Sequence, residues 1–245
     1  MRIMYLGDIH GNFNLINQYV DRFSISDTHI IQVGDFGVGF DTFFKERKKL
    51  ESINTILLEK NIYFYAIRGN HDRPSYFEND PFGLSNIKLI SDYTVLEIES
   101  KKILCIGGAV SIDRSYRITD AQKMGDNSYV HGQTWFKGEE FNLDVDLLET
   151  FRDINIVVTH TAPDYCTPDN SLGFGAMVNS WINIDSSLKL DLMDERRKMS
   201  IAFEILKRNN EISNHLYGHF HFSNLLNFEG IEHRLLGINE LYEDR

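Results

Sequence analysis

The sequence predicts an α/β protein built as an αββα sandwich, with two packed β-sheets flanked by helices. Three observations support this fold class. Short runs rich in β-branched and aromatic residues alternate with helical patterns in the first third of the chain. Further on, strand-like runs follow one another closely, separated by turn-like residues. The helical patterns concentrate around the alternating part, which favours a parallel sheet there.

The first third of the chain reads as β-α-β-α-β. Residues 2–6, 28–33 and 62–67 are apolar runs of strand length, and we expect them to be buried strands. Residues 41–60 lie between the last two runs and predict a helix, because apolar side chains recur at helical spacing with Lys and Glu between them. These apolar positions are Phe43, Phe44, Leu50, Ile53 and Leu57. Such alternation predicts a largely parallel sheet that is covered by helices.

The remaining elements follow in a different style. Runs 87–90, 94–98 and 103–107 are closely spaced and predict a hairpin or meander. Another apolar run spans residues 154–158. A helix is predicted around residues 192–206, from apolar residues at Leu192, Met199, Ala202, Phe203 and Leu206. Short strands near 215–217, 224–228 and 233–237 complete the expected second sheet.

We interpret residues 1–245 as one domain, because no linker demands a boundary. Two stretches, 111–150 and 162–187, read as loop insertions, since both are rich in Asp, Asn, Ser, Gly and aromatic residues and lack a clean period. Long loops of this kind in compact domains are typically lids or binding loops.

Composition narrows the class of protein. The chain is 42% hydrophobic, yet no apolar run approaches the ~20 residues of a membrane span, so we expect neither a signal peptide nor a membrane partner. Cys105 and Cys166 form no CxxC pair, and Cys105 lies in an apolar run that predicts a buried thiol. Free thiols indicate a reducing compartment, hence the cytoplasm. A net charge of −11 disfavours binding of extended nucleic acid.

Residues that can bind metal ions or catalyse reactions follow five of the predicted strands. Asp, Asn or His comes just after each strand, and at four of the five places a glycine precedes the first of them. In open α/β sheets ligands bind outside the carboxyl ends of the strands, so we expect these side chains to converge. The convergent residues are Asp8, His10, Asp35, Asn70, His160, His219 and His221, with His71 beside them.

These seven side chains suit metal ions. They offer more N and O donors than one transition metal needs, but suit two ions that share a bridging carboxylate. Two neighbouring ions are a known device for displacement at phosphorus, because they activate water and neutralise the phosphoryl oxygens. Bound metal would also give an acidic protein a locally positive site for a phosphate group.

The sequence blocks of this set resemble the signature of the calcineurin-like metallophosphoesterases. The blocks are GDIHG, GDFG, RGNHD, TH and GHFH, and they occur in the order of that family from residue 7 to residue 221. The resemblance therefore covers nearly the whole chain. It implies the two-sheet sandwich of that family and a metal-dependent hydrolase acting on phosphoesters.

The resemblance also implies a role for each residue. Asp8, His10, Asp35 and His221 would bind one metal. Asp35, Asn70, His160 and His219 would bind the other, so that Asp35 is the bridge. His71 would act at the leaving group as proton donor or charge stabiliser, oriented by Asp72. The ligand types fit two divalent ions of Mn, Fe or Zn.

The expected activity is hydrolysis of phosphomonoesters of small molecules, that is, a phosphatase. No arginine follows Asp35 in the stretch GDFGVGF, where the protein serine/threonine phosphatases of the superfamily carry one, and this disfavours a dedicated phosphoprotein phosphatase. A phosphodiesterase or nuclease acting on nucleotide diesters is the alternative. A non-catalytic metal-binding scaffold is the alternative from another class, which the full ligand set and His71 disfavour.

Further basic residues are open to two interpretations. Arg114 and Arg117 follow another strand and could bind a substrate phosphate as bidentate donors, or form surface ion pairs with Asp113 or Asp120. Outside the ordered series we interpret four histidines as structural or surface residues. These are His29, His131, His215 and His233.

Overall fold

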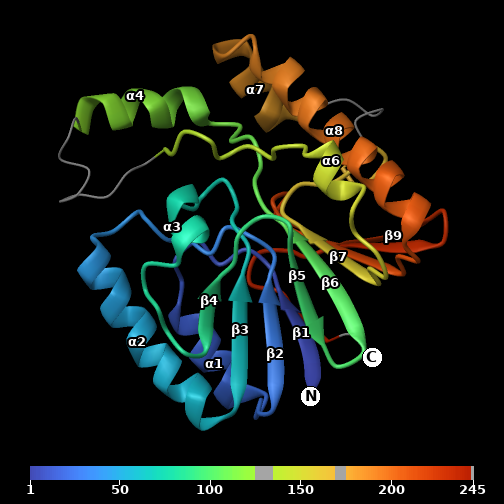
Figure 1. The fold of residues 1–245 in the computed structure, drawn as a ribbon. Coiled ribbons are helices and arrows are strands. Elements are labelled where there is room, and N and C mark those ends of the chain that lie inside the picture. The colour runs from blue at the N-terminus through green and yellow to red at the C-terminus, as the bar shows by residue number, and fades with distance from the viewer. Residues whose placement is uncertain (125–134, 169–174, 244–245) are drawn as a thin grey trace.

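Two β-sheets packed face to face form the centre of the protein (Figure 1), whose computed structural model describes residues 1–124, 135–168 and 175–243. The first sheet has the strand order β11-β1-β2-β3-β4. Its strands are β1 (Arg2–Leu6), β2 (Thr28–Gln32), β3 (Ile62–Ala66), β4 (Ile87–Leu89) and β11 (Leu241–Glu243). Strands β1 to β4 are parallel, and β11 pairs with β1 in the antiparallel direction.

The second sheet has the order β5-β6-β7-β8-β10-β9. Its strands are β5 (Thr94–Ile98), β6 (Lys101–Ile106), β7 (Ile156–Thr159), β8 (Asn214–Tyr217), β9 (Asn224–Phe228) and β10 (Ile231–Leu235). The inner strands are mutually parallel, whereas β5 and β9 pair antiparallel with their neighbours.

Helices cover the outer faces of both sheets (Figure 1). On the side of the first sheet lie α1 (Asn14–Arg22), α2 (Phe43–Glu59) and α3 (Pro74–Asn79). On the side of the second lie α6 (Val145–Leu148), α7 (Ala176–Ile184) and α8 (Leu188–Asn209), with α4 (Arg114–Met124) above both. Among the helices of the described ranges, none combines the length and apolar character that a membrane crossing requires.

Alternating side chains of the strands build three apolar layers. In β1, Ile3 and Tyr5 pack between the sheets, while Met4 and Leu6 pack in the layer under α1 and α2. In β7, Val157 belongs to the layer under α8 and its neighbours in the strand point between the sheets. Burial on both faces explains why these strands read as continuous apolar runs. The predicted αββα sandwich is therefore confirmed.

One prediction about the strands is only partly right. The predicted hairpin is formed by β5 and β6, but run 87–90 does not join it. This run becomes β4, which pairs parallel with β3 in the other sheet. The physical reason is the helical crossover α3 between β3 and β4, since such a crossover returns the chain parallel to the strand that it left.

The expected loop insertions contain helices. Helix α4 lies in stretch 111–150 and α7 in stretch 162–187, while residues 125–134 and 169–174 of these stretches are outside the described residues. Helix α7 contacts α8 through Val178, Trp181 and Ile182, but none of its residues is fully buried. A helix without a buried face needs no regular spacing of apolar residues, so no helical pattern is visible in the sequence here. The interpretation of the chain as one domain stays a prediction.

Replacement of Leu50 tests the layer under the first sheet. Leu50 of α2 is fully buried, whereas Leu58 of the same helix is 58% exposed. We expect Leu50→Ala to lower the free energy of unfolding by about 2–5 kcal/mol, because it removes apolar contacts and leaves a cavity. Leu58→Ala is the matched control and should change it by no more than about 0.5 kcal/mol. Urea denaturation followed by circular dichroism measures both, and equal effects would contradict the assigned orientation of α2.

Candidate metal centre

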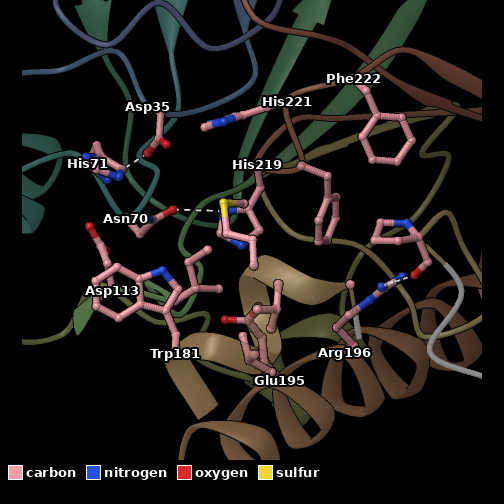
Figure 2. Close-up of a pocket in the computed structure, with 17 residues that line it drawn as sticks. Asp35, Asn70, His71, Asp113, Trp181, Glu195, Arg196, His219, His221 and Phe222 are labelled. Carbon is pink, nitrogen blue, oxygen red and sulfur yellow. Dashed lines mark hydrogen bonds between the residues drawn. The ribbon is translucent and has the colours of Figure 1, made fainter. Parts of the chain in front are cut away.

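The carboxyl ends of five parallel strands meet where the two sheets adjoin. Strands β1, β2 and β3 of the first sheet end there, as do β7 and β8 of the second. All seven metal-ligand candidates from the sequence lie at these ends, in the short segments that follow the strands. Figure 2 shows Asp35, Asn70, His219 and His221 along one side of the cavity that these segments border.

One set of donors consists of Asp8, His10, Asp35 and His221. One ligand atom from each lies within 4.8 Å of those of the others. The Nε2 atoms of His10 and His221 are 3.1 Å apart, and His221 Nε2 is 3.4 Å from Asp8 Oδ2. His10 Nε2 is 3.8 Å from Asp35 Oδ2. The set thus matches the first group of ligands implied by the sequence.

The second set surrounds the other oxygen of Asp35. His160 Nε2 lies 3.2 Å from Asp35 Oδ1 and 3.1 Å from Asn70 Oδ1. Asn70 Oδ1 is also 2.9 Å from His219 Nδ1. Asp35 therefore directs Oδ2 at one set of donors and Oδ1 at the other.

The donor atoms fit cations. The Oδ2 atom of Asp35 is buried and has no hydrogen-bond partner among the described residues. A buried carboxylate oxygen without a partner is strongly unfavourable unless positive charge neutralises it. His160 Nδ1 lies 2.8 Å from the carbonyl oxygen of Val33 and can donate its proton there, so displacement of the Nε2 proton by a cation would leave the Nε2 lone pair facing Asp35 and Asn70.

Charge and burial shift the pKa values within the centre. Burial raises the pKa of Asp8. Burial by itself would lower the pKa of His160, but the adjacent Asp35 carboxylate outweighs it and raises the pKa of His160 to about 9. Burial also dominates at His71, whose pKa falls to about 4. The negative potential that holds a proton on His160 is the potential that would attract a metal cation.

Four ligand candidates adopt left-handed backbone conformations. His10, Asp35, His219 and His221 have φ values of 45°, 56°, 71° and 64°. This region costs non-glycine residues on the order of 1–3 kcal/mol each, and it persists where surrounding contacts enforce it. One such contact is the carbonyl of Asp35, which accepts the N–H groups of Ile9 and His10. At these four residues the backbone conformation is unfavourable, but it directs the side chains toward the other donors.

Glycines before the ligands allow strands to approach closely. A Cβ atom at Gly69 would lie 2.1 Å from Asp35 Oδ1, and one at Gly218 would lie 2.2 Å from Asp8 Oδ1. No real Cβ atom tolerates such separations. The two glycines are therefore required because a carboxylate from another strand occupies the space of their side chains.

A buried polar cluster fixes the orientation of Asn70. Asn70 Nδ2 donates to Ser111 Oγ at 2.9 Å, and Ser111 Oγ donates to Glu139 Oε2 at 2.9 Å. Arg117 Nη1 also donates to Ser111 Oγ, at 2.5 Å. With its NH₂ group held by Ser111, Asn70 must point its oxygen at the metal centre.

Sequence reasoning missed Ser111 and Glu139. Ser111 comes shortly after the end of β6, as other site residues follow their strands, and this position was the available signal. Glu139 lies in a stretch without a recognisable pattern.

The two arginines that were candidates for phosphate binding make different contacts in the structure. Arg117 lies behind Asn70 and donates to its carbonyl oxygen at 3.3 Å. Arg114 is not brought to the centre, because it pairs with Asp185 at 2.8 Å and with Asp191 at 2.6 Å. These acidic partners differ from the Asp113 and Asp120 that the sequence suggested, whereas Arg117 does form the suggested ion pair with Asp113, at 3.8 Å. Arg114 thus ties α4 to the region where α7 meets α8.

Asp72 lies beneath the centre and binds backbone. Its carboxylate accepts N–H groups from Phe36, Gly37, Val38 and Gly69 at 2.7–3.1 Å. The described contacts include no hydrogen bond from the His71 ring to Asp72. The structure therefore places Asp72 as the link between the loops after β2 and β3, instead of as the partner that orients His71.

His71 stands at the edge of the cavity. Its ring stacks on Phe40 at a centroid distance of 5.9 Å and meets the ring of His10 edge-on at 4.9 Å. Its backbone N–H donates to Asp35 Oδ1 at 2.7 Å. The ring thus lies beside the donors without belonging to either set.

The cavity next to the donors has a volume of about 490 Å³. Figure 2 shows Trp181, Glu195 and Arg196 on the side opposite Asp35 and His221. The lining is mainly apolar away from the donors, with Ile112, Met177, Val178, Trp181, Leu192, Phe220 and Phe222. Arg196 is engaged by the carbonyls of the loop after β7, including those of Ala162, Pro163 and Cys166. The site therefore joins polar donors to an apolar chamber.

Of the four histidines that we interpreted as structural or surface residues, three lie in the described part of the chain. His29 stacks between Tyr63 and Tyr65, at centroid distances of 5.2 and 6.0 Å. His215 and His233 are fully buried in the second sheet. His131 lies outside the described residues.

Replacement of Asp72 tests its backbone role. Asp72→Asn keeps the size of the side chain but turns an NH₂ group toward two backbone donors. We expect it to lower the free energy of unfolding by about 3 kcal/mol in the presence of a chelator, because buried N–H groups lose their acceptor. Asp21→Asn on the exposed side of α1 is the control. A change no larger than that of the control would show that the loops do not depend on this carboxylate.

The family of calcineurin-like phosphoesterases has a model that matches residues 1–223 of this chain. Three solved structures are similar over nearly the whole chain. A phosphopantetheinyl hydrolase from Mycobacterium tuberculosis is 13% identical, with a TM-score of 0.50, and the match covers 99% of this chain and 95% of that one.

The other two structures come from different organisms. The TT1561 protein of Thermus thermophilus is 10% identical, with a TM-score of 0.52 and coverage of 99% and 98% of the two chains. A dimetal phosphatase from Danio rerio is 12% identical, with a TM-score of 0.50 and coverage of 96% and 87%. At these identities the likeness concerns the fold. The search of curated proteins found no match.

Proposed function

Because this chain belongs to the calcineurin-like phosphoesterase family and is a metal-dependent phosphoester hydrolase, we propose that it is a phosphatase that hydrolyses phosphomonoesters of small molecules with two divalent metal ions. One observation carries the proposal. Asp35 directs each of its carboxylate oxygens at a separate set of N and O donors. A carboxylate shared in this way is what a two-ion centre needs.

Each set would hold one ion. Asp8, His10, Asp35 and His221 form the first, and Asp35, Asn70, His160 and His219 form the second. Two bound ions would supply activation of water and neutralisation of the phosphoryl oxygens. Four positive charges against the two carboxylates leave a positive site in a chain whose net charge is −11, so a phosphate group is attracted there. Imidazole, carboxylate and amide donors suit Mn, Fe or Zn.

His71 would protonate the departing alcohol. Burial keeps its pKa near 4, so the ring by itself is neutral at neutral pH. An anionic phosphoester in the cavity raises that pKa, because negative charge favours the imidazolium. The ring would then hold a proton where the leaving oxygen needs it. Arg117 and Ser111 act indirectly in this scheme, since they position Asn70.

The chamber supports a small substrate with an apolar part. Its apolar wall from α7 and α8 faces the donors across the cavity, which suits the organic portion of a phosphomonoester. Trp181, Phe220 and Phe222 also favour a second candidate, a phosphodiesterase acting on nucleotides, because bases stack on aromatic side chains. Both cysteines are free, which supports the proposed cytoplasmic location.

Metal dependence and bond type are tested together. The chain is stripped with a chelator, reloaded with manganese, and assayed with an aryl phosphate monoester and the matching diester. We expect the stripped chain to be inactive and the reloaded chain to prefer the monoester. Preference for the diester would instead support the phosphodiesterase.

Asp35→Asn should reduce turnover by more than about 100-fold, because one carboxylate supports both donor sets. Asp21→Asn is the control at an exposed position. Full activity of folded Asp35→Asn with fewer than two bound ions per chain would contradict the two-ion centre.

His71→Gln tests proton donation through the leaving group. An alkyl phosphate has a poor leaving group that needs a proton, whereas a nitrophenyl phosphate leaves without one. We expect the alkyl phosphate to lose about 10²- to 10⁴-fold in kcat and the nitrophenyl phosphate far less. Equal losses for both substrates would mean that His71 acts by binding instead.

Trp181→Ala tests the apolar chamber. We expect KM for naphthyl phosphate to rise about 3- to 10-fold, because an aromatic contact is lost, while KM for glycerol phosphate stays unchanged. Met193→Ala is the control, since Met193 is exposed on α8 and does not line the cavity. Equal KM changes for both substrates would contradict a role of Trp181 in recognising apolar groups.

A further inference from the structure

Three buried donor side chains meet on the outer face of the second sheet, away from the catalytic donors. They are Cys166, His215 and His233, and all are fully buried. His215 of β8 and His233 of β10 are direct partners in the parallel register, so their side chains leave the sheet side by side. Cys166 comes from the loop after β7. Phe203 of α8 covers both rings, at centroid distances of 4.6 and 5.7 Å.

The three donor atoms are spaced as ligands of one ion would be. The Nδ1 atoms of His215 and His233 are 2.9 Å apart, and Cys166 Sγ lies 3.3 Å from His233 Nδ1. All three fall within 4.8 Å of one another. Tetrahedral zinc with ordinary bond lengths separates two nitrogens by roughly 3.3 Å and a nitrogen from a sulfur by roughly 3.6 Å. A small outward movement of the rings reaches this geometry.

Hydrogen bonding settles where the lone pair of His215 points. The hydroxyl of Thr159 donates its proton to the carbonyl oxygen of Thr161. The hydroxyl oxygen, 2.7 Å from His215 Nε2, must therefore accept the proton on that nitrogen. His215 Nδ1 consequently has no proton and turns its lone pair toward His233 and Cys166.

In the absence of an ion, the imidazole of His233 can carry its proton on either ring nitrogen. Its Nε2 is buried and has no hydrogen-bond partner among the described residues. A proton on Nε2 would leave that N–H unsatisfied and would oppose two lone pairs that lie 2.9 Å apart. A proton on Nδ1 would leave the Nε2 lone pair buried and unused. The second form pairs the two Nδ1 atoms in a hydrogen bond, which an ion bound between the donors would replace, while Nε2 stays unpaired in every case.

The two rings of the cluster are in the protonation state that metal binding needs, whereas the thiol is not. Burial lowers the pKa of His215 and brings that of His233 to about 4, so both rings are neutral at pH 7 and offer lone pairs. Burial raises the pKa of the Cys166 thiol to about 12. Metal binding therefore requires that the thiol release its proton to solvent as the metal–sulfur bond forms.

We propose that Cys166, His215 and His233 form a further metal site, in which they supply three ligands to one zinc ion. Thiolate sulfur with two imidazoles is a ligand set that zinc prefers, whereas manganese and magnesium prefer oxygen. The ion would tie the loop after β7 to strands β8 and β10. That loop extends to Pro168 at the wall of the cavity, and Thr159 precedes the ligand His160, so the zinc ion would brace the catalytic centre from behind.

Cobalt substitution tests the proposal. The full chain is expressed with cobalt in place of zinc, and the bound metal and the near-ultraviolet spectrum are measured. A thiolate-to-cobalt charge-transfer band is specific for this site, because the catalytic donors include no sulfur. Its result is therefore independent of the proposed phosphatase activity. We expect the band in the wild type, and its absence at cobalt saturation would overturn the proposal.

Variants assign the band to the three residues. Cys166→Ser should lose the band and one equivalent of metal per chain. Cys105→Ser is the matched control, because Cys105 is equally buried but lies in β6 outside the cluster, and it should keep both. If Cys166→Ser does not fold, His233→Gln should weaken the band and lose the same equivalent. A band that survives unchanged in either variant, or that depends on Cys105, would overturn the assignment.

Discussion

Two buried carboxylates at the junction of the sheets impose the constraint on which the catalytic architecture depends. Asp8 and Asp35 are almost wholly inaccessible to water, and one oxygen of Asp35 has no hydrogen-bond partner among the described residues. Negative charge in such a place is tolerated only with positive charge beside it. Imidazoles from both sheets surround the carboxylates, and cations fit between them. The site thus brings side chains from both sheets into contact at one edge.

The fold sustains this unfavourable arrangement through contacts outside the ligand set. Left-handed backbone at His10 and Asp35 is stabilised by hydrogen bonds between the loops after β1 and β2. Asp72 collects four backbone N–H groups from the loops after β2 and β3. Ser111 sets the direction of the Asn70 amide. The backbone strain at these ligand candidates is balanced by well-paired polar groups directly behind them.

In the proposed mechanism, specificity and chemistry would come from different parts of the chain. The donors follow strands of the two sheets, whereas the apolar wall of the cavity comes largely from α7, α8 and the loop after β8. A centre of this kind can keep its ligands while the wall changes with the substrate, because the two share few residues. The loop that carries Cys166 connects the two parts, from the strand end at His160 to the cavity wall at Pro168.

The sequence by itself determined the two-sheet fold and the ligand candidates, including Asp35 and His160. Parallel strands bring their carboxyl ends to one edge, so residues that follow strands converge wherever the loops lead afterwards. Tertiary structure alone decided the partners of Asp72 and Arg114, the pairing of β4 with β3, and the contact of His215 with His233. The physical reason is that these contacts depend on strand register and loop packing between segments far apart in the chain, for which no local pattern of side chains exists.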